Sequence, residues 1–195
     1  MPTAAPMRPT ELAEPLVDDA ELDDATLVVR ARGGDLRAYE LLVQRYQGPI
    51  YRLAVRILAS RSDAEDVVQD VFLTAWRRLD QLEREAAFVG WLYRTATNRC
   101  LNVIRNRKPV AEADLDLHES KNRTEHAVET NAQLAALGEA LGRLSAEQRA
   151  CWLLREVHGR SYEEIAVAVG TTSTAVRGRI ARARAQLAEV MAPWR

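Results

Sequence analysis

The segment SYEEIAVAVGTTSTAVRGRIARARAQL, residues 161–187, contains two short amphipathic helices that meet at a glycine. Ser161 and Glu164 have the spacing of a capping box, which starts a helix by satisfying its first backbone N–H groups. Gly170 can adopt the left-handed backbone conformation that ends this helix. Either of the two threonines that follow can cap a second helix. The segment therefore predicts a helix, a tight turn and another helix.

The second of these helices carries four arginines and no acidic residue. Its apolar residues recur at helical spacing along one face: Val176, Ile180, Ala183, Leu187 and Val190. The opposite face presents Thr174, Gly178 and Ala181, flanked by Arg177 and Arg182. A surface helix of another bundle would share this periodicity. The caps, the glycine turn and the acid-free arginine helix together favour a DNA-binding helix-turn-helix at about residues 161–182.

Charge is distributed unevenly along the chain, although the net charge at pH 7 is only −1. Residues 1–25 contain seven acidic residues and one arginine, and residues 110–131 contain six acidic residues and two basic ones. By contrast, residues 91–108 contain five basic residues and no acid. With the arginine helix, this makes two basic elements that can bind phosphate, separated by acidic segments.

The other periodic segments also predict helices, and no alternating pattern predicts a strand. In the first half we expect helices at residues 24–32, 36–47, 49–59, 63–79 and 89–106. Asp35 is expected to cap the second, and Gly48-Pro49 to separate it from the third, because proline favours a first helical turn. Leu36, Tyr39, Leu42, Val43 and Tyr46 are expected to face inward. Ser62 and Glu65 are spaced as a capping box for the helix at 63–79. The apolar residues of this helix are expected to face the core: Val67, Val68, Val71, Phe72, Ala75, Trp76 and Leu79.

The second half is expected to contain two further helices before the helix-turn-helix. Leu134, Leu137, Leu141 and Leu144 line one of them. Ser145 and Gln148 are spaced as a capping box for the next, which ends at Gly159.

These patterns predict an all-α protein of two small helical domains joined by a flexible linker. The acidic segment 1–23 is expected to be disordered, the domains to cover 24–108 and 132–195, and the linker to cover 109–131. No signal peptide or membrane-length apolar run is present, so we expect a cytoplasmic protein without membrane insertion. The cysteines and histidines are not spaced as metal ligands or catalytic groups. We therefore expect no catalytic residue, metal or cofactor, and no enzyme.

Four segments, taken in order, resemble the compact extracytoplasmic-function (ECF) group of bacterial RNA polymerase sigma factors. They are DAEDVVQDVFLTAWRRL (63–79), FVGWLYRTATNRCLNVIR (88–105), LREVHGRSYEEIA (154–166) and VRGRIARARAQL (176–187). The resemblance covers residues 24–108 as the family's region two and 132–191 as its region four. It implies a protein that binds core RNA polymerase, reads the promoter's minus-ten element with region two and reads its minus-thirty-five element with region four.

The resemblance implies a polymerase-binding surface on the helix at 63–79. Asp66, Val67, Val68, Gln69 and Asp70 stand where the family docks on the clamp helices of the largest polymerase subunit. From the residues alone, the polar side of this helix would be an ordinary solvated face. Carboxylates there could pair with polymerase arginines and orient the docking.

The helix at 89–106 interleaves aromatic, basic and amide side chains, a combination that suits single-stranded DNA. The candidate minus-ten residues are Trp91, Tyr93, Arg94, Asn98, Arg99, Asn102 and Arg105, with Asp80 in the preceding loop. Rings can stack on exposed bases, while guanidinium groups follow phosphates. Alternatively, Trp91 and Tyr93 are core residues, and for Trp91 a core position fits equally well. The resemblance implies a further role for the loop Asp80 to Ala87, because it stands where the family captures an unstacked minus-ten base.

For the minus-thirty-five element, angular positions opposite the apolar face identify the candidates. Ser173, Thr174, Arg177, Gly178 and Arg182 are expected in the groove, and Arg155, Arg179 and Arg184 nearer the phosphates. Thr172 to Ala175 replace the family's usual Pro-Val-Gly-Thr sequence, and Gly178 stands where serine is common. Gly178 either permits close approach to DNA or is merely tolerated. The exact promoter sequence therefore does not follow from the resemblance.

An alternative function is a stand-alone helix-turn-helix regulator that binds duplex DNA as a dimer. It accounts for residues 132–191 but leaves residues 24–108 without a task, and no dimerisation helix is evident. We therefore expect no homo-oligomer, and expect core RNA polymerase and promoter DNA, duplex and single-stranded, as partners on the nucleoid. Relatives are commonly sequestered by an anti-sigma factor, which the resemblance implies as a further partner.

Overall fold

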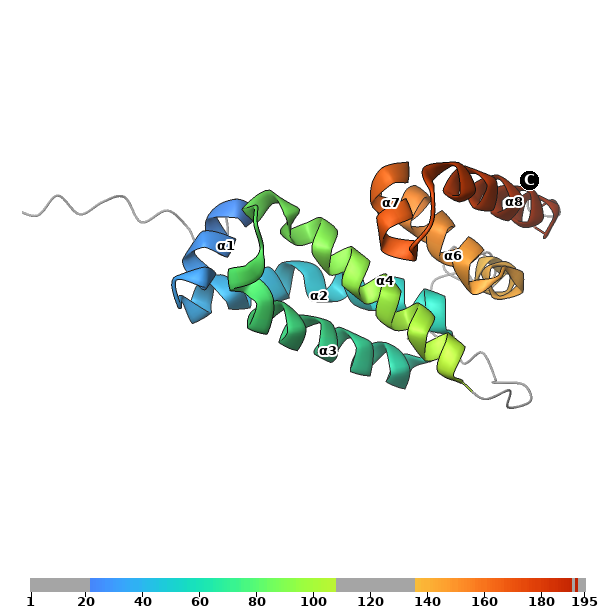
Figure 1. Ribbon diagram of the computed structural model, residues 1–195. Helices are drawn as coiled ribbons and strands as arrows, with labels where there is room; N and C mark the ends of the chain where they lie inside the picture. The colour runs from blue at the N-terminus through green and yellow to red at the C-terminus, as the bar shows by residue number, and fades with distance from the viewer. Residues whose placement is uncertain (1–21, 108–135, 191, 193–195) are drawn as a thin grey trace, which may run out of the picture.

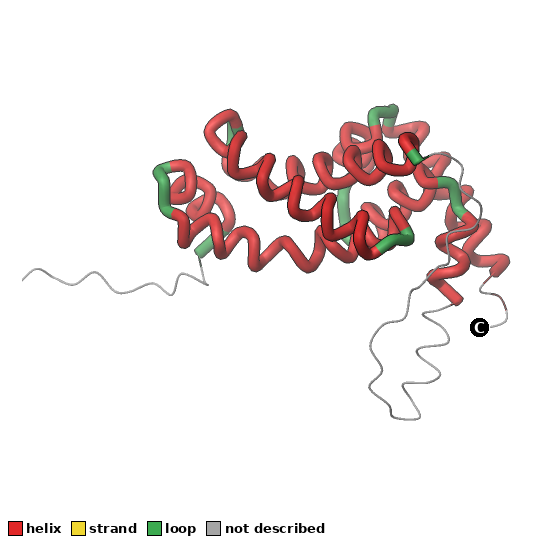
Figure 2. The backbone as a smooth tube through the Cα atoms, turned by 90° about the horizontal axis from the view of Figure 1, so that it is seen from below, coloured by secondary structure: helices red, strands yellow, loops and turns green. Residues whose placement is uncertain are grey.

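The computed structural model describes residues 22–107, 136–190 and 192 of the chain. Within these ranges every regular element is helical, as Figures 1 and 2 show. This confirms the predicted all-α class. The expected linker, residues 109–131, and nearly all of the acidic segment 1–23 lie outside the described residues.

The first half is a bundle with one long helix at its centre. Its helices are α1 (Asp24–Arg32), α2 (Leu36–Leu58), α3 (Arg61–Arg78) and α4 (Phe88–Asn106). Helix α2 packs against each of the other three. Leu42, Ile50, Leu53 and Phe88 are among the large side chains buried between them. This core fixes the position of α4, whose outer face is the basic surface predicted from the sequence.

The expected break at Gly48-Pro49 is wrong, because α2 runs through it as one helix. Proline in a helix interior removes one backbone hydrogen bond and costs about 3 kcal/mol. Buried side chains on both sides of Pro49, such as Leu42 and Leu53, pack in the same core. Burial of one large aliphatic side chain contributes roughly 1.5–3 kcal/mol, so two or more of them offset the proline.

Two further expectations in this half need correction. Helix α3 begins at Arg61 because Ser60, rather than Ser62, is its N-cap and accepts a hydrogen bond from the Asp63 N–H at 3.3 Å. Leu36, which the sequence predicts to face inward, is 69% exposed and is the first residue of α2.

The second half contains a helix at 136–143, α6 (Ala146–Trp152), a π-helical turn η4 (Leu153–Val157), α7 (Tyr162–Val169) and α8 (Ser173–Val190). The two predicted capping boxes, at Ser145 and Ser161, are both confirmed. Gly170 ends α7 with φ of 66°, and the Thr172 hydroxyl accepts from the Ala175 N–H at 3.2 Å. Helices α7 and α8 therefore form the predicted helix-turn-helix.

The two halves touch through α4 and α2. Helix α7 lies along α4 in Figure 1, and α6 reaches the end of α2. Arg149 of α6 donates to the Ile57 carbonyl of α2 at 2.9 Å and to the carbonyls of Gly142 and Leu144 at 3.2 Å. One partly buried guanidinium thus satisfies carbonyls at the ends of two helices from different halves of the chain.

Candidate nucleic-acid and polymerase interfaces

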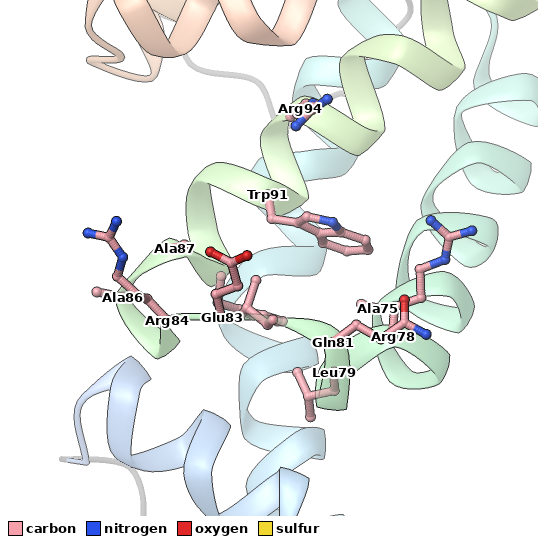
Figure 3. Close-up of a pocket in the computed structure, with 12 residues that line it drawn as sticks. Ala75, Arg78, Leu79, Gln81, Glu83, Arg84, Ala86, Ala87, Trp91 and Arg94 are labelled. Atoms are coloured by element: carbon pink, nitrogen blue, oxygen red, sulfur yellow. The ribbon is translucent and has the colours of Figure 1, made fainter.

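A pocket of about 660 Å³ lies between α4 and the loop that precedes it. Its walls come from the end of α3, the loop and the first two turns of α4: Ala75, Arg78, Leu79, Gln81, Leu82, Glu83, Arg84, Ala86, Ala87, Phe88, Trp91 and Arg94. In Figure 3 the Trp91 indole stands across the pocket from the loop residues Gln81 and Glu83. The pocket therefore combines an aromatic face with hydrogen-bonding groups and with three arginines, Arg78, Arg84 and Arg94.

The loop consists of two 3₁₀ turns, η2 (Leu79–Gln81) and η3 (Glu85–Ala87). Arg32 at the end of α1 reaches it with three donors, to the carbonyls of Leu79 and Leu82 and to the Glu85 carboxylate. A backbone hydrogen bond and the Arg32 charge hold the pKa of Glu85 below its ordinary value. Glu85 is therefore engaged within the fold, whereas Glu83 lines the pocket.

The predicted minus-ten residues of α4 lie in the pocket, along the exposed surface of the helix, or against the second half of the chain, and Arg94 belongs to both of the first two. Trp91 and Arg94 line the pocket. Arg94, Arg99, Asn102 and Arg105 are exposed on α4, and Asn98 is half-buried. Arg99 forms an ion pair with Asp70 of α3 at 2.7 Å, and Arg105 donates to Asn102. Asp80 is exposed but does not line the pocket, whereas Gln81 and Glu83 of the same loop do.

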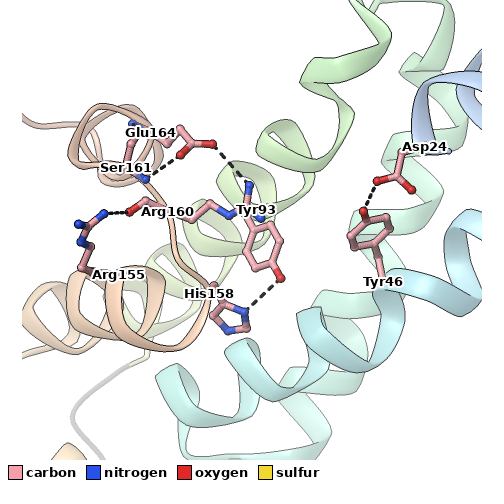
Figure 4. A network of polar contacts seen from close by, with 8 residues as sticks. All are labelled: Asp24, Tyr46, Tyr93, Arg155, His158, Arg160, Ser161 and Glu164. Atoms are coloured by element: carbon pink, nitrogen blue, oxygen red, sulfur yellow. Dashed lines mark hydrogen bonds and ion pairs between the residues drawn. The ribbon is translucent and has the colours of Figure 1, made fainter.

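Tyr93 belongs to the fold rather than to the exposed surface of α4, which corrects its assignment to DNA. Its side chain is 5% exposed and faces the second half of the chain. Its hydroxyl lies 3.1 Å from Nδ1 of His158, and the Arg160 guanidinium lies 4.5 Å above its ring (Figure 4). Arg160 is itself held by Glu164, the residue that completes the α7 capping box.

His158 is held neutral in this contact. Burial, helped by the positive charges of Arg160, Arg56 and Arg52, lowers the pKa of His158 to about 4. Burial also raises the pKa of Tyr93. At neutral pH the uncharged imidazole can accept the Tyr93 hydroxyl proton as a hydrogen bond, whereas a charged imidazole would face three arginines.

We expect acid to weaken this contact. The pKa of His158 is about 4 in the folded chain and 6.5 when the ring is exposed, so the unfolded chain binds more protons between these pH values. Above pH 6.5, neutral His158 makes its full contribution to the free energy of unfolding. As the pH falls from 6.5 towards 4 this contribution is lost, and at pH 5 the free energy of unfolding is lower by up to about 2 kcal/mol. Thermal melts at pH 7 and pH 5 measure it. His158→Gln should reduce the difference between the two melts, and an equal difference in both proteins would contradict the assignment.

Helix α3 presents an exposed stripe opposite the core. Asp66 and Gln69 are exposed on it, and Asp70 is half-buried beside Arg99. Val67 is 5% exposed, so its side chain packs in the core and is not available to a partner, and Val68 is partly buried at the edge of the core. Of the five residues predicted to bind polymerase, Asp66 and Gln69 are exposed, Asp70 and Val68 are partly exposed, and Val67 is buried.

Two apolar residues that were not predicted to belong to the polymerase surface extend this stripe. Leu73 and Trp76 are 48% and 39% exposed, and Trp76 packs on the Tyr39 ring with a centroid distance of 4.8 Å. Trp76 was expected to face the core. The spacing from Asp66 to Gln69, Leu73 and Trp76 keeps these residues on one helical face, and this spacing was the available signal. We call Asp66, Gln69, Asp70, Leu73 and Trp76 the α3 face.

On α8 the predicted apolar face is buried, while Thr174, Arg177 and Arg182 are exposed and Ser173 is half-buried. A Cβ on Gly178 would meet only the Arg182 guanidinium, at 3.7 Å, so the fold itself does not require glycine there. Arg179 is half-buried, and its Nη1 is enclosed near the buried Cys151 thiol.

The remaining phosphate candidates have partners within the chain. Arg155 donates to the Arg160 carbonyl at 2.9 Å and lies over the Tyr162 ring. Arg184 forms an ion pair with Glu156 at 2.6 Å, which raises the pKa of Arg184. Arg177 also lies over the Tyr162 ring, at 5.2 Å from its centroid, and keeps its exposure. Arg177 and Arg182 are the exposed arginines of α8 for which no ion pair is found among the described residues.

Comparison with known proteins gives matches over both halves. Residues 42–110 match the family model Sigma-70 region 2, and residues 134–187 match Sigma-70, region 4. The chain is 35% identical over 182 residues to RNA polymerase sigma-H factor of Pseudomonas aeruginosa, covering 87% of this chain and 94% of the relative. It is 38% identical over 177 residues to ECF RNA polymerase sigma-E factor of Escherichia coli K12, covering 84% and 92%.

Solved structures match the fold of both halves. CnrH in complex with the cytosolic domain of CnrY has a TM-score of 0.66 at 29% identity, covering 87% of this chain and 97% of that one. Sigma factor RpoE from Bartonella quintana, in complex with the anti-sigma factor NepR, has a TM-score of 0.65 at 24% identity, and this likeness shows the fold alone. In the part of the chain that the structure describes, no helix is long and apolar enough to cross a membrane.

Proposed function

Because this chain belongs to the ECF family of RNA polymerase sigma factors, we propose that it binds core RNA polymerase and directs initiation at its own class of promoter. Residues 24–108 would dock on the polymerase and read the melted minus-ten element, and residues 132–195 would read the minus-thirty-five duplex. Its place of action is then the cytoplasm, with the polymerase on the nucleoid.

The pocket between α4 and the loop is the observation that carries the minus-ten assignment. Its volume of about 660 Å³ is that of a ligand site. An unstacked base has two flat faces and a hydrogen-bonding edge. Trp91 offers a ring for stacking, Gln81 and Glu83 offer groups for the edge, and Arg94 and Arg84 offer charge for phosphates. The exposed Arg94, Asn102 and Arg105 continue this surface along α4.

Magnitudes show why such a site works only as part of a larger complex. Opening ten base-pair steps costs on the order of 14 kcal/mol, at about 1.4 kcal/mol a step. Capture of one or two bases returns roughly 1–3 kcal/mol each. The chain therefore depends on core polymerase to hold the rest of the bubble, and the α3 face is the surface that we assign to that contact.

Arg177 is the residue of α8 that we assign to base reading, since it is exposed near the start of the helix. Arg177→Ala is expected to cost roughly 1–3 kcal/mol in binding to the preferred minus-thirty-five duplex and to flatten the preference among sequences. Promoter-swap transcription with a set of minus-thirty-five variants measures both effects. Arg184→Ala is the matched control, because it removes an exposed arginine of the same helix that pairs with Glu156, and any loss of phosphate attraction should weaken all sequences alike. Unchanged preference in Arg177→Ala would reject the assignment.

Run-off transcription with purified core polymerase tests the function as a whole. We expect initiation at a defined subset of a promoter library only when the chain is added. A stand-alone dimeric regulator would instead bind duplex DNA tightly without polymerase and run as a dimer in gel filtration. Failure to associate with core polymerase, or association without start-site choice, would reject the sigma function.

We also propose an anti-sigma factor as a partner. The relative CnrH was solved with the cytosolic domain of CnrY bound, and this chain covers 97% of CnrH. Exposed apolar residues such as Leu73 and Trp76 offer an inhibitor the same surface that polymerase needs. Competition between such a protein and core polymerase for the chain would be the expected result.

A further inference from the structure

Short turns supply the internal hydrogen bonds of the loop that walls the pocket. Neither of its 3₁₀ turns has a side-chain cap. The Leu82 N–H donates to the Leu79 carbonyl at 3.4 Å, the Ala87 N–H donates to the Arg84 carbonyl at 3.0 Å, and the Phe88 N–H donates to the Glu85 carbonyl. Each of these bonds closes a single turn, so the shape of the loop as a whole depends on neighbouring elements.

Arg32 supplies the hydrogen bonds that reach this loop from another element, as far as the described residues show. Its Nη2 donates to the Leu82 carbonyl at 2.7 Å, its Nε donates to the Leu79 carbonyl at 3.3 Å, and its Nη1 pairs with the Glu85 carboxylate at 2.8 Å. One planar group thus fixes three points of the loop. A lysine ammonium cannot reproduce this divergent set of donors.

The fixed points flank the polar and charged residues of the pocket, and two of them, Leu79 and Leu82, line the pocket themselves. Gln81 lies between the Leu79 and Leu82 anchors, and Glu83 and Arg84 lie between the Leu82 and Glu85 anchors. Arg32 itself does not line the pocket. It also precedes residues 42–110, the segment that matches the family model.

We propose that Arg32 is a positioning residue for base capture, which acts from α1 by fixing the loop that carries Gln81, Glu83 and Arg84. The inference rests on the proposed function of the pocket. With the loop anchored, the edge-reading groups stand at a set distance from the Trp91 ring, so the pocket distinguishes one base from another. Without the anchor, the same groups would accept several bases with similar affinity.

The test compares Arg32→Ala and Arg32→Lys with the wild-type chain, and uses Arg37→Ala as a control. Arg37 is an exposed arginine of α2 that makes an i,i+3 ion pair with Glu40. The first measurement is hydrogen exchange of the amides at residues 79–87 in the free full-length chain. The second is binding of the holoenzyme to fork DNA that carries each of the four bases in turn at the captured position.

We expect both Arg32 variants to speed exchange at residues 79–87 and to leave polymerase affinity unchanged. Capture of one base raises the affinity for fork DNA by roughly 5- to 150-fold. For the preferred base, we expect the affinity of the variants to be roughly tenfold lower than that of the wild type. The ratio among the four bases should approach one. This ratio would not change if Arg32 merely stabilised the domain, because a uniform loss of folded protein weakens all four bases alike.

Unchanged exchange at residues 79–87 would overturn the proposal before any DNA is added. Faster exchange with an unchanged base ratio would also overturn it. If the wild-type holoenzyme shows no base preference, the proposed function of the pocket fails, and the positioning role fails with it. If Arg32→Lys behaves as wild type, a single charge suffices and the three-point anchor is rejected.

Discussion

Trp76→Ala is expected to weaken binding of core RNA polymerase by roughly 30- to 900-fold, which corresponds to about 2–4 kcal/mol. The Trp76 ring is 39% exposed, yet it already packs on Tyr39, so little conformational freedom remains to be lost on docking. It lies on the same helical face as Asp66, Gln69 and Leu73. An aromatic anchor surrounded by polar groups is the usual composition of a binding hot spot. Fluorescence anisotropy with labelled core polymerase measures the change.

Val29→Ala provides the matched control for this experiment. Val29 is apolar and 55% exposed, but it lies on α1 outside the α3 face. We expect its variant to bind polymerase as the wild type does. Thermal melts separate docking from folding, because the loss of the Tyr39 contact should cost only about 0.5–1.5 kcal/mol beyond the area it buries. Equal polymerase affinity of Trp76→Ala and wild type would remove Trp76 from the interface.

Trp91→Ala is expected to reduce open-complex formation by roughly 5- to 150-fold while leaving polymerase affinity intact. Base stacking on an aromatic side chain is worth about 1–3 kcal/mol, and the Trp91 ring is the aromatic face of the pocket that points towards the loop. Stopped-flow fluorescence on a promoter with a reporter base beside the minus-ten element measures the rate and extent of opening.

Trp91→Phe separates stacking from packing, since phenylalanine keeps a stacking face and loses only part of its area. It should retain most of the activity that alanine removes. Fork DNA with the bubble already open reports the same capture without the cost of melting. If Trp91→Ala captures the open fork as the wild type does, or loses polymerase affinity to the same degree, the stacking role is wrong.

Helix ends were predictable where the signal lies within a few residues. The capping boxes at Ser145 and Ser161, the left-handed Gly170 and the buried stripe from Val176 to Leu187 all follow from local spacing, and each is present in the structure. A cap is a hydrogen bond between residues three apart, so neighbouring residues contain the whole interaction. The same reasoning misplaced the N-cap of α3 by two residues, because Ser60 and Ser62 carry the same chemistry.

The outward or inward orientation of single residues was less predictable. The mixture of aromatic, basic and amide residues made Tyr93 a DNA candidate, with the core as its alternative, and periodicity placed Trp76 in the core; the structure buries Tyr93 and leaves Trp76 39% exposed. Tyr93 faces His158, which lies 65 positions further along the chain. Periodicity identifies the apolar side of a helix. It does not show whether another helix packs against the residues at the edge of that side, and this contact decides whether they are buried.

Spacing, capping chemistry and charge along the chain were thus enough to predict an all-helical protein with a helix-turn-helix and a basic helix α4, while the resemblance of four segments indicated the family. Only the tertiary structure showed that α2 continues through Pro49, that Leu73 and Trp76 extend the α3 face, and that Arg32 anchors the loop of the pocket. The reason is physical. Local signals come from interactions between residues three or four positions apart, whereas these features depend on side chains from helices distant in sequence, whose packing outweighs local preference.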